Sequence, residues 1–169
     1  MRKTTVLWML MLALPLALTA QEDTTTLIHT GDTVPSFTFE TEKGKKVRIE
    51  DYRGKLVWIN LFATWCPPCN AELPEAQKVW DKYKANPRFA FFVFGRQENW
   101  DKLLPYKAKK GFTFPILPDA DRAIFSRFAT QFIPRNILVD EKGTILFESK
   151  GFEPKEFEAL VKLIEEHLK

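Results

Sequence analysis

Two cysteines, Cys66 and Cys69, are the residues whose type and spacing predict chemistry, and the chain contains no others. Pro67 and Pro68 separate them, and the pair follows an apolar run over 56–62 that is typical of a buried strand. In the first turn of a helix, this spacing brings two sulfurs close enough to bridge. It also places the first sulfur at the positive end of the helix dipole, which favours a thiolate. Because a thiolate attacks a disulfide and a second thiol resolves the mixed disulfide, the pair predicts thiol–disulfide exchange.

Three other uses of such a cysteine pair explain the sequence less well. A zinc site lacks its second pair of ligands, because the only histidines, His29 and His167, form no ligand-spaced cluster. Haem attachment needs a histidine directly after the second cysteine, where this chain has Asn70. A purely structural disulfide stays open as an alternative, although a bridge across so short a loop removes little chain entropy.

The elements that must position this pair follow from apolar periodicity and turn residues. In the first half we expect a hairpin over 37–49, buried strands over 56–62 and 89–94, and between them a helix that the cysteine pair opens, with apolar positions from 73 to 83 and a stop at 86–87. A short helix near 100–104 that Pro105 kinks or restarts and a strand-like segment over 112–117 follow. The chain then has a helix over 124–128 capped by Asp119 or Asp121, a hairpin over 136–147 and a final helix from Pro154. Strands that alternate with helices predict an α/β fold with a central mixed sheet flanked by helices on both faces.

Composition supports one soluble globular domain. The 169 residues are 45% hydrophobic and 28% charged, which argues against disorder. The formal net charge is only +3, so the sequence lacks the basic excess that nucleic-acid binding needs. We expect no nucleic-acid partner and a monomer.

The first twenty residues have the pattern of an export signal. Arg2 and Lys3 precede an apolar run over 6–18, and Thr19-Ala20 offers a small residue at a cleavage point. We therefore predict a signal peptide over 1–20 and the folded domain over 21–169, located in the periplasm or elsewhere outside the cytoplasm. An uncleaved anchor is the alternative: the apolar run is shorter than the roughly 20 residues that span a bilayer, but Leu18 is large for its place before the cleavage point.

Beyond these patterns, the sequence resembles the thioredoxin superfamily, and more narrowly the exported TlpA/ResA-type thiol–disulfide oxidoreductases. The resemblance rests on Leu56-Val57-x-x-Asn60-x-Phe62-Ala63-Thr64-Trp65-Cys66-x-Pro68-Cys69, followed by Glu72 and Pro74. Gly31-Asp32-x-Val34-Pro35-x-Phe37 and Phe132-Ile133-Pro134-Arg135-Asn136, before Asp140-x-x-Gly143, support it. It implies a thioredoxin-like fold with an N-terminal β-hairpin extension.

The resemblance also implies roles around the cysteines. Cys66 matches the nucleophile and Cys69 the resolving thiol, so both are candidate catalytic residues. Trp65 resembles the aromatic residue that flanks the attacking sulfur. We expect Trp65, Pro67 and Pro68 to form part of the surface that meets the substrate, around an accessible sulfur at Cys66.

Pro134 matches the proline that follows a cis peptide bond in this superfamily. A cis bond would turn the backbone of Ile133 toward the sulfurs, where a substrate segment could pair with it as an added strand. We therefore add Pro134 to the candidate catalytic residues and Ile133 to the substrate-binding residues. The residues alone leave an ordinary loop proline as the alternative.

Two departures from thioredoxin itself carry information, and the first concerns an acid. Thioredoxin has a buried acid six residues before its first cysteine, where this chain has Asn60, which cannot take a proton. The TlpA/ResA type instead has an acid three residues after the second cysteine, which here is Glu72. We predict that Glu72 assists the deprotonation of Cys69. A solvated carboxylate that only favours the start of the helix is the alternative.

The second departure is the dipeptide Pro67-Pro68. Because proline has no N–H, two donors that could reach the Cys66 thiolate are missing. A less stabilised thiolate makes the reduced protein a stronger reductant. The dipeptide therefore favours a reductase over a strong oxidant.

The expected function is reduction of disulfides in other exported proteins, for example in cytochrome c maturation, with a membrane-bound thiol carrier as electron donor. The cycle requires no cofactor beyond the redox-active Cys66–Cys69 disulfide, and no metal. One alternative is a peroxiredoxin-like peroxidase, which would have threonine where this chain has Ala63. Two further alternatives are a copper-delivery or binding module on the same fold and a peptide-binding domain whose bridge never cycles.

Overall fold

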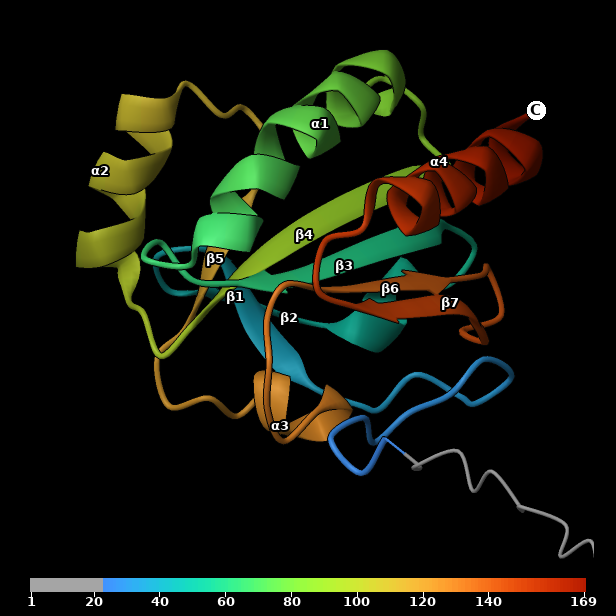
Figure 1. Ribbon diagram of the computed structural model, residues 1–169, viewed down its shortest axis with the longest axis horizontal. Helices are drawn as coiled ribbons and strands as arrows, with labels where there is room; N and C mark the ends of the chain where they lie inside the picture. Colours follow the sequence, from blue (N-terminus) through green and yellow to red (C-terminus); the bar gives the residue numbers. More distant parts are fainter. Residues whose placement is uncertain (1–22) are drawn as a thin grey trace, which may run out of the picture.

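The computed structural model describes residues 23–169, so the predicted signal peptide over 1–20 lies outside the described residues. Its elements are β1 (Thr38–Glu42), β2 (Lys45–Arg48), the short 3-10 helix η1 (Ile49–Tyr52), β3 (Leu56–Phe62), α1 (Pro67–Tyr83), β4 (Phe89–Arg96), α2 (Trp100–Lys110), β5 (Ile116–Asp119), α3 (Phe125–Phe128), β6 (Arg135–Val139), β7 (Ile145–Lys150) and α4 (Pro154–Leu168). Figure 1 shows their arrangement around a central sheet.

The central sheet is mixed and has the strand order β5-β4-β3-β6-β7. The pairs β3–β4 and β4–β5 are parallel, whereas β3–β6 and β6–β7 are antiparallel. β3 lies at the centre and is buried along its whole length, as its continuous apolar run predicts. The sequence correctly predicts this strand, its parallel neighbour and the C-terminal hairpin.

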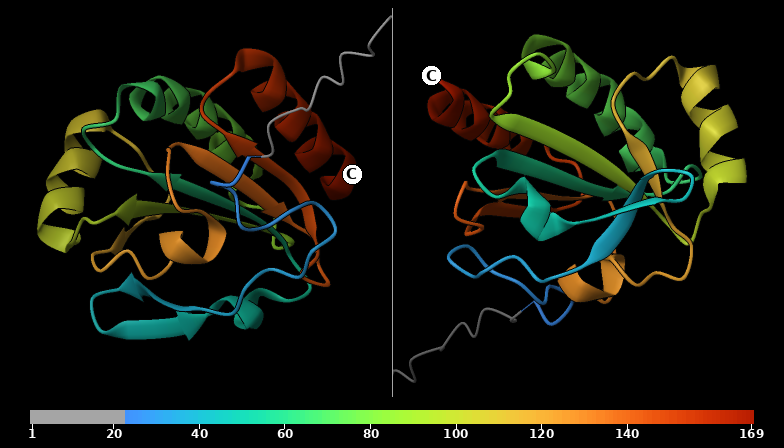
Figure 2. Two further views of the ribbon diagram at one scale, coloured as in Figure 1. Left: turned by 60° about the horizontal axis from the view of Figure 1, so that its bottom comes forward. Right: turned by 180° about the vertical axis from the view of Figure 1, so that it is seen from behind.

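Alternation along β3 creates two cores, one on each face of the sheet. Leu56, Trp58 and Phe62 belong to the core beneath α1 and α4. Val57 and Ile59 belong to the other core, which the hairpin β1–β2 and the short helix α3 cover. Figures 1 and 2 show these layers on opposite sides of the sheet. The predicted mixed sheet with elements on both faces and an N-terminal hairpin is therefore confirmed.

The helix expected near 100–104 is longer than predicted and does not restart at Pro105, because α2 continues through this proline to Lys110. Its ends are well satisfied: the Asn99 side chain accepts a hydrogen bond from the Lys102 N–H, and Gly111 closes the helix in the left-handed conformation with φ 72°. These caps hold the helix together across the one backbone donor that Pro105 lacks.

The topology brings two distant loops to one edge of the sheet. α1 begins a few residues after β3 ends, and β6 begins beside that same end because it runs antiparallel to β3. Asn60 on β3 lies directly opposite Asn136 on β6. The loop before β6, which contains Ile133 and Pro134, consequently meets the start of α1, where the cysteines lie.

Candidate active site

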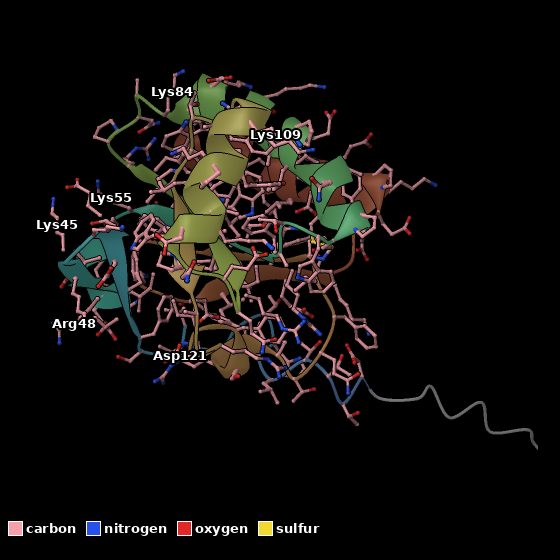
Figure 3. The ribbon with its side chains drawn as sticks, turned by 90° about the vertical axis from the view of Figure 1, so that its left-hand side faces the viewer. Lys45, Arg48, Lys55, Lys84, Lys109 and Asp121 are labelled. Atoms are coloured by element: carbon pink, nitrogen blue, oxygen red, sulfur yellow. A yellow bond between two sulfur atoms is a disulfide. The ribbon has the colours of Figure 1, made fainter. Side chains whose placement is uncertain are left out.

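Cys66 and Cys69 form a disulfide at the start of α1, with an S–S distance of 2.10 Å and a Cα–Cα distance of 5.3 Å. Figure 3 shows it as a yellow bond at the start of this helix. Cys66 is the N-cap of α1, and its Sγ accepts a hydrogen bond of 3.3 Å from the Cys69 N–H. Pro67 and Pro68 occupy the two positions between them and donate none. The structure thus confirms that the spacing lets the sulfurs bridge at a helix start.

The expectation of an accessible sulfur at Cys66 is wrong for this disulfide-bonded state, in which Cys66 is only 2% exposed. Its Sγ is bonded to the Cys69 sulfur and lies 3.9 Å from the carbonyl oxygen of Ile133. The loop before β6 therefore packs against the bridge. By contrast, the neighbouring Trp65 is 64% exposed, so the surface beside the disulfide is an aromatic side chain.

A buried acid holds the segment that leads into the cysteines. The carboxylate of Glu98, which follows β4, accepts hydrogen bonds from the Thr64 N–H at 3.0 Å and the Thr64 hydroxyl at 2.6 Å. The Asn70 side chain donates to the carbonyl oxygens of Thr64 and Cys66. These contacts fix the backbone on both sides of the exposed Trp65.

The peptide bond between Ile133 and Pro134 is cis, as the resemblance implies. Pro134 is buried and Ile133 is half-buried. Among residues 23–169, neither the N–H nor the C=O of Ile133 takes part in a backbone hydrogen bond. The structure thus brings Ile133 and Pro134 together with the two cysteines, as predicted.

Glu72 lies one turn after Cys69 on α1 and is buried, not solvated. Its Oε1 accepts a hydrogen bond of 2.5 Å from the Asn60 side chain, and its Oε2 accepts one of 2.9 Å from Asn136. Burial raises the pKa of Glu72 to about 7, although the two amide donors oppose this shift. The carboxyl group can therefore gain or lose a proton near neutral pH.

Trp58 fixes the orientation of the amides around Glu72. The Asn136 Oδ1 accepts hydrogen bonds of 2.9 Å from the Trp58 indole N–H and from the Asn60 side chain. Because an indole N–H only donates, the Asn136 oxygen must face Trp58 and its NH₂ group must face Glu72. Asn60 and Asn136 are cross-strand partners, so both amides point to the same face of the sheet, toward α1.

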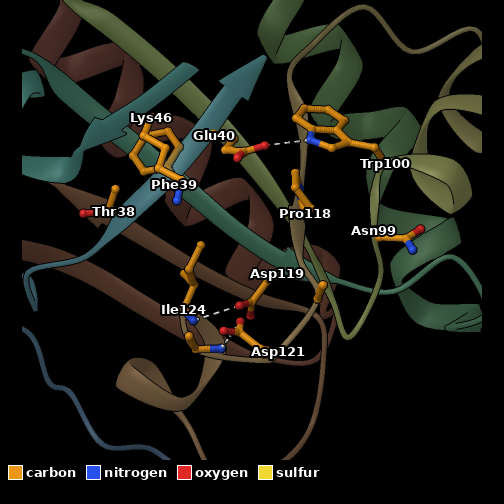
Figure 4. Close-up of a pocket in the computed structure, with 12 residues that line it drawn as sticks. Thr38, Phe39, Glu40, Lys46, Asn99, Trp100, Pro118, Asp119, Asp121 and Ile124 are labelled. Carbon is orange, nitrogen blue, oxygen red and sulfur yellow. Dashed lines mark hydrogen bonds between the residues drawn. The ribbon is translucent and has the colours of Figure 1, made fainter. Parts of the chain in front are cut away.

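A cavity of about 490 Å³ lies away from the disulfide, between the hairpin β1–β2, the start of α2 and the loop before α3 (Figure 4). Two of its carboxylates already have partners: Glu40 accepts from the Trp100 indole, and Asp119 accepts from the N–H groups of Ile124 and Phe125. None of the predicted site residues lines it. We therefore place the chemistry at the disulfide.

Two features are absent from the described part of the chain. No group of His, Cys, Asp and Glu side chains within residues 23–169 is arranged to hold a metal ion. No helix in the same range has the length and apolar character needed to cross a bilayer.

Comparison with known proteins agrees with this site. The family model described as Redoxin matches residues 29–164. The chain belongs to the redoxin family. The thiol–disulfide oxidoreductase ResA of Geobacillus thermodenitrificans (strain NG80-2) is 30% identical to this redoxin over 146 residues, which cover 85% of this chain and 82% of the relative. Because relatives of this kind are thiol–disulfide oxidoreductases and the chain has the Cys66–Cys69 pair, this redoxin is a ResA-type thiol–disulfide oxidoreductase of the thioredoxin superfamily.

Solved structures support the fold of this redoxin. The solution structure of a candidate protein disulfide isomerase from Bacteroides thetaiotaomicron is similar with a TM-score of 0.80 and 34% identity, over 85% of this chain and 92% of that one. A crystal structure assigned as the thiol:disulfide interchange protein DsbE from Chlorobium tepidum gives a TM-score of 0.72 and 25% identity, over 84% of this chain and 99% of that one. The thioredoxin-like fold predicted from the sequence is thus confirmed.

Sequence reasoning missed two residues that organise the site of this redoxin. Asn136 supplies half of the amide pair around Glu72, and Arg135 is a buried cation beneath the loop before β6. Arg135 and Asn136 are the two consecutive residues after Pro134, so strand alternation sends their side chains to opposite faces of the sheet. This alternation is the sequence signal from which the two orientations could have been predicted, but it does not identify the buried partners of either side chain.

The raised pKa of Glu72 predicts how stability changes with pH. The folded protein holds the proton up to about pH 7, whereas a carboxyl with the ordinary pKa of 4.5 releases it earlier. Glu72 therefore contributes most below about pH 4.5, and roughly 3 kcal/mol is lost as pH rises through about 7. In urea denaturation of the disulfide-bonded proteins, the free energy of unfolding of the wild type should fall by this amount relative to that of Glu72→Gln as pH rises through about 7.

A matched control separates this effect from other carboxylates. Glu75 lies on the same helix, is partly exposed and pairs with Lys78, so Glu75→Gln should follow the wild type. A stability difference between wild type and Glu72→Gln that stays constant from acid to neutral pH would contradict the raised pKa.

Proposed function

We propose that this protein is an exported thiol–disulfide oxidoreductase that reduces disulfides in other extracytoplasmic proteins, for example during cytochrome c maturation. One observation carries the proposal: the Cys66–Cys69 bridge at the start of α1 packs against the Ile133 carbonyl, with the buried Glu72 one turn further on. An attacking sulfur, a resolving sulfur, a backbone strip for the substrate and a proton acceptor are thus present in one site.

The first step is attack by the Cys66 thiolate of the reduced protein on a substrate disulfide. A bond forms between Cys66 Sγ and one substrate sulfur, and the substrate's own S–S bond breaks. The other substrate sulfur leaves as a thiolate. The free backbone groups of Ile133 support an extended substrate segment beside Cys66, as an added strand would be held.

The second step is resolution by Cys69. Its sulfur attacks Cys66 Sγ, which releases the second substrate thiolate and leaves the Cys66–Cys69 disulfide, so two electrons pass to the substrate. Cys69 must lose its proton first, and it is buried among apolar residues that disfavour a thiolate. Glu72, ionised above a pKa of about 7, accepts this proton.

The cycle needs an electron donor to restore the dithiol. We propose a membrane-bound protein dithiol, which attacks the Cys66–Cys69 bridge and is itself oxidised to a disulfide. Export is supported by the charged and apolar pattern of residues 1–20. Outside the cytoplasm, disulfides persist and provide substrates.

The donors around Cys66 support the proposed direction of transfer. An N-cap side chain can accept from the second and third backbone N–H groups of its helix. Here Pro68 removes the second, and only Cys69 donates. A thiolate with one such donor is stabilised less than one with two, which favours release of electrons to the substrate.

A second candidate function, a peptide-binding module whose bridge never cycles, is favoured by one observation. The disulfide is almost closed to solvent, because Cys66 is only 2% exposed. Its reduction potential separates the two functions: a value within reach of protein dithiols supports the oxidoreductase cycle, and a value too low for them supports the binding module.

Trapping tests the proposed function. Reduced Cys69→Ala cannot resolve, so a peptide disulfide should convert it to a stable mixed disulfide through Cys66, detectable by mass spectrometry. Cys66→Ala is the matched control and should form no such adduct. Equal adduct formation by the two variants, or none by Cys69→Ala, would show that Cys66 is not the attacking sulfur.

Restoring a donor tests the direction of transfer. Pro68→Ala returns the second N–H, which should stabilise the Cys66 thiolate by about 1.4 kcal/mol and raise the reduction potential by about 30 mV. Pro67→Ala removes the same kind of ring but adds only the first N–H, which does not reach the cap, so its potential should match the wild type. Redox titration against a thiol buffer measures both. If Pro67→Ala shifted the reduction potential as much as Pro68→Ala does, the cause would be the loss of a rigid proline ring and not the restored N–H group.

A further inference from the structure

Phe132 combines two features that are rarely found together. Its backbone lies in the left-handed region with φ 63°, which a bulky aromatic residue seldom adopts. Its side chain is 55% exposed, so packing of the ring into a core does not explain the conformation. Such an outlier persists only when its surroundings determine it, and it often marks a functional site.

The buried side chain of Arg135 holds the backbone of Phe132 in this conformation. It is only 2% exposed, and its guanidinium donates to the carbonyl oxygens of Phe132 at 3.2 Å and Gln131 at 2.8 Å. It also donates to the Thr26 hydroxyl at 2.7 Å and the Thr25 hydroxyl at 3.1 Å. The planar group thus fastens the turn at Phe132 to the segment at the start of the described chain.

Phe132 directly precedes the residue that contacts the sulfur of Cys66. The next residue, Ile133, has its carbonyl oxygen 3.9 Å from Cys66 Sγ. Trp65, the other large aromatic side chain that is strongly exposed in the described part of the chain, directly precedes Cys66. Exposed aromatic side chains therefore adjoin both chain segments that contact the sulfur.

Charge near Phe132 is balanced. The Lys150 Nζ lies 5.6 Å from the ring centroid, and it also pairs with Asp23 at 2.9 Å. The ammonium group is therefore shared between the ring and a carboxylate, which leaves little net charge to attract a charged substrate side chain. The exposed ring offers apolar contact area instead.

We propose that Phe132 is a specificity-determining residue that selects substrate segments carrying an apolar side chain next to the reacting cysteine. The proposal rests on the proposed function and defines its substrate class. A substrate segment extended along Ile133 passes the Phe132 ring, which Arg135 holds in place before binding. Apolar contact with the ring then lowers the barrier for attack by Cys66 on that disulfide.

The test uses two symmetric peptide disulfides that are identical except for Phe or Ser beside the cysteine. The reduced full-length protein is mixed with each, and the second-order rate constants are measured by alkylation and mass spectrometry. Bis(2-hydroxyethyl) disulfide, which is too small to reach the ring, normalises the rates. We expect the wild type to prefer the Phe peptide about tenfold and Phe132→Asn to lose this preference.

Asparagine is chosen because it tolerates the left-handed backbone and removes only the ring. Phe132→Trp keeps an aromatic ring and should keep the preference. Leu104→Asn is the matched control, because Leu104 is a 48% exposed apolar residue on α2 and should also keep it. Equal wild-type rates for the two peptides, or a preference that survives in Phe132→Asn, would overturn the proposal. Failure of the proposed function itself would differ, since the reduced wild type would then react with none of the three disulfides.

Discussion

The buried carboxyl group of Glu72 is the constraint on which the arrangement of the active site depends. A carboxylate buried without partners would be very costly, and this one is tolerated because Asn60 and Asn136 donate to its two oxygens. Those amides come from neighbouring strands, and the Trp58 indole sets the direction of one of them. The requirement to satisfy one carboxyl group thus links α1, β3 and β6 directly behind the disulfide.

The same junction places the groups to which the proposed function assigns substrate contact. β6 begins where β3 ends, so the loop that contains Ile133 meets the N-terminus of α1 and its carbonyl contacts Cys66 Sγ. Alternation then sends Asn136 toward Glu72 and Arg135 to the opposite face, where it fastens the turn before Ile133. The hydrogen bond to Glu72 and the support of the turn before Ile133 therefore originate from adjacent residues of a single strand.

Local patterns in the sequence predict much of this structure. The spacing of Cys66 and Cys69 fixes a bridge at a helix start, and the apolar run of β3 fixes a central strand, because both depend on neighbouring residues. The exposure of Cys66 and the burial of Glu72 are different, since each depends on a loop or strand more than sixty residues away in the chain. The turn at Phe132 could not be predicted from local sequence either, because it requires contacts from both Arg135 and the Thr25 segment.

The central claim is that Glu72 takes the proton from Cys69 during resolution. The most direct measurement is the rate of the resolving step in a single turnover, followed by tryptophan fluorescence across pH, for the wild type and Glu72→Gln. The wild-type rate should rise with pH through about 7, and Glu72→Gln should lose this ionisation and resolve about 100-fold more slowly. Identical rates and pH profiles for the two proteins would contradict the claim.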